Sequence, residues 1–125
     1  MQKQNIAIIG LGRVGSAFLG AMLQKADKGI NLACVAERMD TPARAKAAAE
    51  GIKVKTLDEI VAMGDAIDVI FDVTGIPEVR KELREKLSAA SNRHTVIASE
   101  TIVRIIWSLI SDEALPVIEG RKTGY

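Results

Sequence analysis

Residues 6–18, IAIIGLGRVGSAF, decide the fold of this protein. A short apolar run ends at Gly10, Gly12 and Gly15, and apolar residues at helical spacing follow these glycines. A short, β-branched apolar run is typical of a strand that is buried on both faces of a sheet. The stretch therefore predicts a buried strand, a tight glycine turn and an amphipathic helix, in that order.

The same alternation of strand and helix continues along the chain. Further apolar runs predict strands, and capping residues or prolines predict where the helices between them begin. The expected strands are 5–9, 30–37, 52–55, 67–73 and 94–99, and the expected helices begin after the glycines, at Pro42, after Thr56, at Pro77 and at Glu100. This alternation predicts an α/β fold, a Rossmann-like doubly wound parallel sheet of five or six strands in the order 3-2-1-4-5, with helices on both faces.

The length allows one such domain. We expect residues 1–113 to form it, and residues 114–125 to be a tail that serves as a sixth strand or a linker. A doubly wound sheet binds ligands in the crevice beside its first strand, at the carboxyl ends of the strands. Candidate binding residues are therefore expected in the turns that follow the strands.

The glycine turn has the G-x-G-x-x-G spacing of a dinucleotide-binding loop. In that role the first glycine permits the turn, the second lets the backbone approach the phosphates, and the third lets the helix pack on the strand. The free amides at the start of the helix attract the anion. Arg13 within the loop could reach a phosphate or remain in solvent. The candidate pyrophosphate contacts are Gly10, Leu11, Gly12, Arg13, Val14 and Gly15.

Glu37 ends the second expected strand, where an acid can accept hydrogen bonds from the ribose of an adenosine. A carboxylate at this place repels a 2′-phosphate, so Glu37 favours NAD over NADP. Arg38 beside it could stack on adenine or meet a 2′-phosphate, which keeps NADP possible. The alternative is that Glu37 is a surface acid at a strand end.

The ends of the fourth and fifth strands complete the candidate site. Val73, Thr74 and Gly75 follow the fourth strand, and Ser99 ends the fifth. Thr74 offers a hydroxyl, and Gly75 allows a close approach of the backbone. The alternative for this stretch is an ordinary turn between a strand and a helix.

Most of the chain, from Ile6 to about Ser99, resembles a known group of domains. The matching stretches are AIIGLGRVG, CVAER, TLDEIVAMGDAIDVIFDVTG, PEVRKELREKL and HTVIAS. They are similar to the NAD(P)-binding Rossmann domain of the glucose–fructose oxidoreductase, homoserine dehydrogenase, aspartate dehydrogenase and dihydrodipicolinate reductase group. The resemblance implies that the glycine turn is the phosphate loop, that Glu37 and Arg38 contact the adenosine, and that Thr74 and Gly75 flank the cofactor.

The chain departs from that group in two respects. Its relatives commonly carry a lysine just after the fifth strand, where this chain has SET at 99–101, and they continue into an α+β substrate domain. We therefore expect the cofactor domain, or a stand-alone relative, of an oxidoreductase, and leave open whether it is an enzyme. The alternative is a non-enzymatic module that senses NAD(H) and acts through its last helix.

The composition limits the partners and the cellular location expected for the protein. The 17 basic and 16 acidic side chains are interspersed, which predicts neither a nucleic-acid surface nor a membrane surface. With Cys34 as the single cysteine, no internal disulfide can form, which favours a reducing, cytoplasmic location. No cluster of residues suggests a metal site.

No catalytic group stands out elsewhere. His94 is expected on the surface or in a turn, and Cys34 in the core. Asp68 and Asp72 lie near the two ends of one strand, too far apart to form a compact pair. The helix after Pro77 is expected to present a solvated face made of Arg80, Lys81, Glu82, Arg84, Glu85 and Lys86.

The last expected helix, 100–113, is apolar around most of its circumference. One sheet face does not normally cover so wide an apolar surface. We therefore expect the helix to pack both on the sheet and on a second copy of the chain or a missing domain. Burial under the tail is the alternative.

Overall fold

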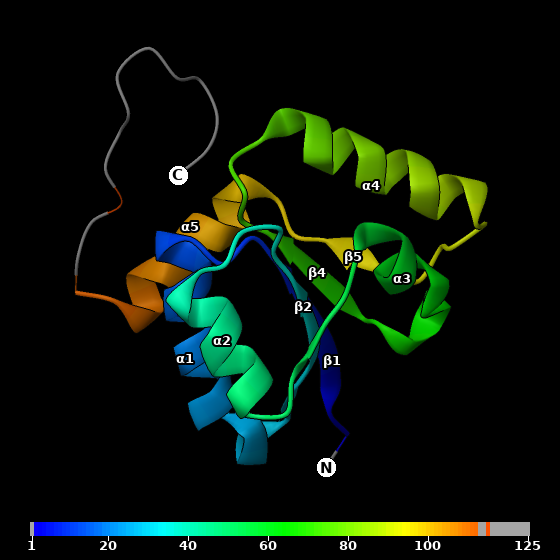
Figure 1. Ribbon diagram of the computed structural model, residues 1–125. Helices are drawn as coiled ribbons and strands as arrows, with labels where there is room; N and C mark the ends of the chain where they lie inside the picture. Colours follow the sequence, from blue (N-terminus) through cyan, green and yellow to red (C-terminus); the bar gives the residue numbers. More distant parts are fainter. Residues whose placement is uncertain (1, 113–114, 116–125) are drawn as a thin grey trace.

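Five parallel strands form one sheet in the order β3-β2-β1-β4-β5, and helices cover both of its faces (Figure 1). This computed structural model describes residues 2–112 and residue 115. It confirms the α/β fold and the strand order that the sequence predicts, whereas the expected tail 114–125 lies outside the described residues except for residue 115. The strands are β1 (Gln4–Ile9), β2 (Ile30–Ala36), β3 (Lys53–Val54), β4 (Val69–Asp72) and β5 (Val96–Ile97). The α-helices are α1 (Arg13–Gln24), α2 (Pro42–Ala49), α3 (Leu57–Ala62), α4 (Pro77–Ala89) and α5 (Glu100–Ile110), and two short 3-10 turns lie at Ala26–Lys28 and Gly64–Ala66.

Two apolar cores lie on opposite faces of the sheet. Ile6 and Ile8 of β1 face α1, α2 and α5, whereas Ala7 and Ile9 face α3 and α4. The alternation follows from the two-residue period of a strand, and the apolar residues on both sides explain why the sequence of β1 is an unbroken apolar run. On the first face, the rings of Phe18 and Phe71 meet edge to face at 5.5 Å.

The register of the central strands brings their carboxyl ends to one level. Ile9 of β1 lies opposite Ala36 of β2 and opposite Asp72 of β4. The turns that follow these strands therefore begin together at one edge of the sheet. This edge is where the candidate residues were expected.

The edge strands β3 and β5 are shorter than the sequence predicts. Each contains two residues and pairs with one neighbour, so fewer ladder hydrogen bonds fix its ends. Before β5, the side chain of Asn92 accepts hydrogen bonds from the amides of His94 and Thr95, at 2.9 and 3.0 Å. These bonds hold residues 94–95 in a turn. The last helix ends at Ile110, before the expected residue 113, which is outside the described residues.

The helix starts follow the predicted capping chemistry. Thr41 caps α2 by accepting from the amide of Arg44, and Thr56 and Glu59 form a reciprocal capping box at α3. Pro42 and Pro77 occupy the first turns of α2 and α4. The β3–α3 turn is thereby fixed at the same edge of the sheet as the glycine turn.

Among the described residues, no helix has the length and apolar character needed to cross a membrane. Within the same residues, no three or more His, Cys, Asp or Glu side chains gather in a way that could hold a metal ion.

Candidate functional site

The turns after β1, β2 and β4 are joined by backbone contacts. The amide of Gly10 donates to the carbonyl of Ala36 at 2.8 Å, and the amide of Val73 donates to the carbonyl of Ile9 at 2.9 Å. Gly10 has φ +92°, and a Cβ atom there would lie 3.0 Å from the methyl of Thr74. The left-handed backbone and this close approach both require glycine at the start of the loop.

The other two glycines of the loop have contrasting surroundings. A Cβ atom at Gly15 would lie 1.9 Å from the carbonyl oxygen of Gly10, so only glycine lets α1 pack this closely. A Cβ atom at Gly12 would meet no atom of the described residues within 4 Å. Gly12 is the N-cap of α1 and has no side chain that could accept from the first amides of the helix. Open space at the positive end of a helix is suited to an anion.

Glu37 bridges the first two turns. Its Oε1 accepts a hydrogen bond from the amide of Leu11 at 3.0 Å, and its Oε2 lies 3.4 Å from the amide of Met39. The carboxylate is thus fixed beside the glycine loop by backbone donors, although the two residues are far apart in sequence. The carboxylate can therefore act as a fixed hydrogen-bond acceptor at the rim of a ligand site.

A cleft of about 690 Å³ opens at this edge of the sheet. Four of the residues that the sequence nominates line it: Gly10, Glu37, Arg38 and Thr74. The cleft also has walls that sequence reasoning missed, and these include Met39, Arg44, Lys55, Thr56, Ile76 and Val79. The β3–α3 part of this wall could have been found from the capping box, because that box places its turn at the carboxyl edge beside the second strand.

The remaining nominated residues lie around the cleft in different roles. The side chains of Leu11, Val14 and Val73 are buried in the core, so only their backbones can face a ligand. The guanidinium of Arg13 lies 5.7 Å from the centre of the Trp107 ring on α5. Ser99 caps α5 by accepting from the amide of Ile102, and Gly75 has φ +69°.

The β4–α4 turn is held by Asp72, a buried acid for which the sequence predicted no role in this turn. Oδ1 of Asp72 accepts hydrogen bonds from the Thr74 amide at 3.2 Å and from the Thr74 hydroxyl at 2.8 Å. Arg80 packs against the same acid, and its side chain is 18% exposed. The prediction that Arg80 lies on the solvated face of α4 is therefore wrong, because the residue lies one turn into the helix on the side that faces β4.

Three titratable groups considered in the sequence, Cys34, His94 and Asp68, do not line the cleft. The thiol of Cys34 is buried in β2, and burial raises its pKa to about 11. His94 pairs with Asp68 at 2.6 Å at the amino end of the sheet, opposite the cleft. Asp68 and Asp72 lie at opposite ends of β4 and do not act together.

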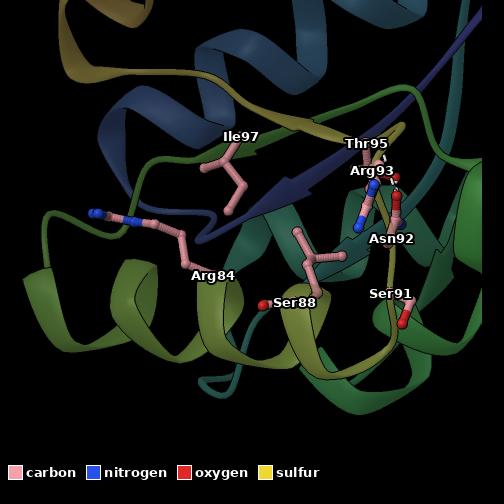
Figure 2. Close-up of a pocket in the computed structure, with 8 residues that line it drawn as sticks. Arg84, Ser88, Ser91, Asn92, Arg93, Thr95 and Ile97 are labelled. Atoms are coloured by element: carbon pink, nitrogen blue, oxygen red, sulfur yellow. Dashed lines mark hydrogen bonds between the residues drawn. The ribbon is translucent and has the colours of Figure 1, made fainter.

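Two further cavities do not resemble the cleft. One, of about 480 Å³, lies between α4 and β5. Figure 2 shows the guanidinium of Arg84 extending away from Ser91 and Asn92, while Arg93 lies beside Asn92, so the two cations do not converge. The other, of about 450 Å³, lies between α1 and α5 and is mostly apolar.

One protein family matches most of the chain. Residues 10–104 match the family model described as homoserine dehydrogenase, NAD binding domain, and this match spans most of the 125 residues. The chain belongs to this family. The match begins at the first glycine of the loop and extends into α5, so it includes the turns that build the cleft. Among curated proteins, a sequence comparison finds no match.

Three solved structures with a similar fold carry dehydrogenase names. Homoserine dehydrogenase of S. aureus is 21% identical, with a TM-score of 0.60 over 90% of this chain and 29% of that chain. The WlbA dehydrogenase of Bordetella pertussis, solved with NADH and UDP-GlcNAcA, is 24% identical, with a TM-score of 0.58 over 78% of this chain and 28% of that one. A candidate myo-inositol dehydrogenase of Sinorhizobium meliloti 1021 is 28% identical, with a TM-score of 0.58 over 76% of this chain and 27% of that one.

These findings confirm the resemblance and the cofactor that the sequence predicts. The chain is an NAD-binding domain of the homoserine dehydrogenase family, and the sensor alternative gains no support over this function. The chain spans less than a third of the length of each of these three structures.

Proposed function

We propose that the cleft between the β1–α1, β2–α2 and β4–α4 turns holds NAD for a dehydrogenase whose substrate-binding part lies outside these 125 residues. The observation that carries the proposal is the contrast between the loop glycines. Gly10 and Gly15 are required by packing, whereas within residues 2–112 no atom lies within 4 Å of a Cβ added at Gly12. Space kept free at the start of a helix is what a pyrophosphate needs.

The side chains around this space fit the rest of a dinucleotide. The carboxylate of Glu37 is fixed by Leu11 and can accept hydrogen bonds from ribose hydroxyls, while Arg38 and the wall of the cleft surround the adenine. The backbone of Thr74 and Gly75 and the start of α5 at Ser99 flank the other half. NAD, when bound, supplies the nicotinamide that accepts or gives hydride. The chain itself binds and orients the cofactor, and we assign no catalytic residue to it.

The proposal is tested by titration with NAD, NADH and NADP and by one substitution with a matched control. In Gly12→Ala, the added methyl group projects into the open space, so we expect affinity for NAD to fall by about tenfold or more, or about 1.4 kcal/mol. The expected cost to folding is at most about 1 kcal/mol, because alanine caps a helix less well than glycine.

Gly20→Ala is the control, since it makes the same change in the middle of α1, where a Cβ atom meets only the end of Lys46 at 3.9 Å. It should bind NAD like the wild type. A wild-type chain that binds none of the three dinucleotides at millimolar concentration contradicts the proposal. Tighter binding of NADP than of NAD contradicts the role of Glu37.

We also propose the wider setting of the domain. The isolated, buried Cys34 supports a reducing, cytoplasmic location. The ordered fold over residues 2–112 supports a domain of about residues 1–113. The apolar residues that α5 exposes, Ile102, Ile105, Leu109 and Ile110, support contact with a second copy of the chain or with a following domain.

A further inference from the structure

The β4–α4 turn carries a buried negative charge directly behind the phosphate loop. Asp72 is 2% exposed, and it holds both the amide and the hydroxyl of Thr74. Thr74 in turn touches Gly10, where an added Cβ would lie 3.1 Å from the Thr74 amide nitrogen. One residue therefore separates the carboxylate from the first glycine of the loop.

Arg80 is the cation that faces this carboxylate. Its Nε lies 3.6 Å from Oδ2 of Asp72, and its Nη2 donates to the backbone carbonyl of Asp72 at 3.2 Å. Its Nη1 also lies 4.0 Å from a carboxylate oxygen of Glu100, at the first residue of α5. Arg80 thus connects β4, the β4–α4 turn and the start of α5.

Asp72 decides which groups the turn can present to the cleft. Because the Thr74 hydroxyl donates its single hydrogen to Asp72 and accepts from the amide of Ile76 at 3.1 Å, it is engaged inside the turn. Thr74 and Ile76 line the cleft, and Gly75 between them has φ +69°. The carboxylate is needed for this shape, but its charge opposes the binding of a diphosphate nearby, since charges of like sign repel strongly where water is excluded.

We propose that Arg80 is a positioning residue that neutralises Asp72, so that the acid can shape the Thr74 turn without repelling the pyrophosphate of the cofactor. Asp72 and Arg80 act through the turn and do not touch the ligand. A buried carboxylate without a paired cation lowers the stability of the folded state, so the Asp72–Arg80 pair also contributes to folding. This inference rests on the proposed NAD site in the cleft.

The test compares binding of NADH, which carries the diphosphate, with binding of adenosine, which does not. In Arg80→Gln, we expect affinity for NADH to fall about tenfold or more, a loss of about 1.4 kcal/mol, while affinity for adenosine changes much less. Arg80→Lys keeps the charge and should recover part of the loss. The double variant Asp72→Asn/Arg80→Gln removes both charges and should bind NADH more tightly than Arg80→Gln alone.

Lys81→Gln is the matched control, because Lys81 lies on the same helix with a side chain that is 77% exposed. It should bind both ligands like the wild type. Equal losses of NADH and adenosine affinity in Arg80→Gln, or no loss in a folded variant, overturn the inference.

If Arg80→Gln does not fold, the comparison rests on the other two variants. For each ligand, the affinity of the folded double variant is divided by the affinity of Arg80→Lys. If this ratio is clearly smaller for NADH than for adenosine, charge compensation is contradicted. If the two ratios are nearly equal, it is supported. If the wild-type chain binds adenosine but no NADH, or neither, the proposed function fails before Arg80 is in question.

Discussion

At the scale of the residue, the three loop glycines show that one motif can serve three physical purposes. Gly10 adopts a left-handed backbone conformation, and Gly15 lets α1 pack against the carbonyl of Gly10. At Gly12, the described residues leave space where a side chain would stand. The first two purposes belong to folding, and we propose that the third belongs to binding. Substitutions at the three positions should therefore have different consequences.

Gly15→Ala should destabilise the fold rather than act on binding alone. The added Cβ would lie 1.9 Å from the carbonyl oxygen of Gly10, so α1 or the loop has to move. Such overpacking costs about 1–3 kcal/mol, which denaturant unfolding monitored by circular dichroism measures. Gly20→Ala should instead gain about 0.5–1 kcal/mol, because alanine favours a helix interior and the site has room. Equal stabilities of the two variants would contradict the close packing at Gly15.

At the scale of the element, the short strand β5 is held to the sheet partly by contacts of the segment that precedes it. Its two residues pair only with β4, and the turn before it is tied to the sheet by Asp68. One carboxylate oxygen of Asp68 accepts from the amide of Asn5 at 2.7 Å, and the other lies 2.6 Å from Nε2 of His94. The acid therefore joins the start of β1 to the segment that enters β5.

The stability of this attachment should depend on pH. The hydrogen bond from the Asn5 amide, together with His94, holds the pKa of Asp68 below its ordinary value of 3.8. A carboxyl with a lowered pKa stabilises the fold fully above its unfolded value, and this contribution is lost as pH falls through the folded value. We expect Asp68→Asn to lower the free energy of unfolding at neutral pH, with a difference from wild type that shrinks below about pH 4.

Asp27→Asn, at an exposed acid on the 3-10 turn after α1, is the control. It should not reproduce that pH-dependent difference. A loss in Asp68→Asn that stays the same from neutral to acid pH would show that the charge of Asp68 does not contribute.

At the scale of the whole molecule, α5 has two different faces. Val103 and Trp107 are buried in the core, and Trp107 also meets Arg13 at the start of α1. On the outer side, Ile105 is 53% and Leu109 is 80% exposed. The helix that closes one layer of the domain thus presents an apolar surface of the kind that other protein surfaces cover.

We expect the isolated chain to self-associate through this face at micromolar concentration. Sedimentation of the purified chain should show a species larger than the monomer, and Leu109→Glu should shift it toward the monomer by placing a charge in the contact. Ala45→Glu, at an exposed position on α2, should leave the distribution unchanged. A wild-type chain that is strictly monomeric and soluble would contradict association between copies.

The sequence by itself determined the order of the elements, the parallel sheet and the glycine loop. These features depend on local periodicity, caps and turns, which neighbouring residues specify. It also nominated Glu37 and Thr74, because the strand ends can be read from the same patterns. What it could not indicate was the exact length of the edge strands, since these are set by pairing with a neighbour distant in sequence.

Only the tertiary structure decided which polar residues meet. It placed Glu37 on the amide of Leu11, brought the β3–α3 turn into the wall of the cleft, and turned Arg80 inward to Asp72. In the sequence, Arg80 is one of several charged residues on one helix, and helical spacing alone does not say which of them faces the sheet. That choice depends on how α4 is docked on β4 and α5, which is a matter of packing between elements far apart in the chain.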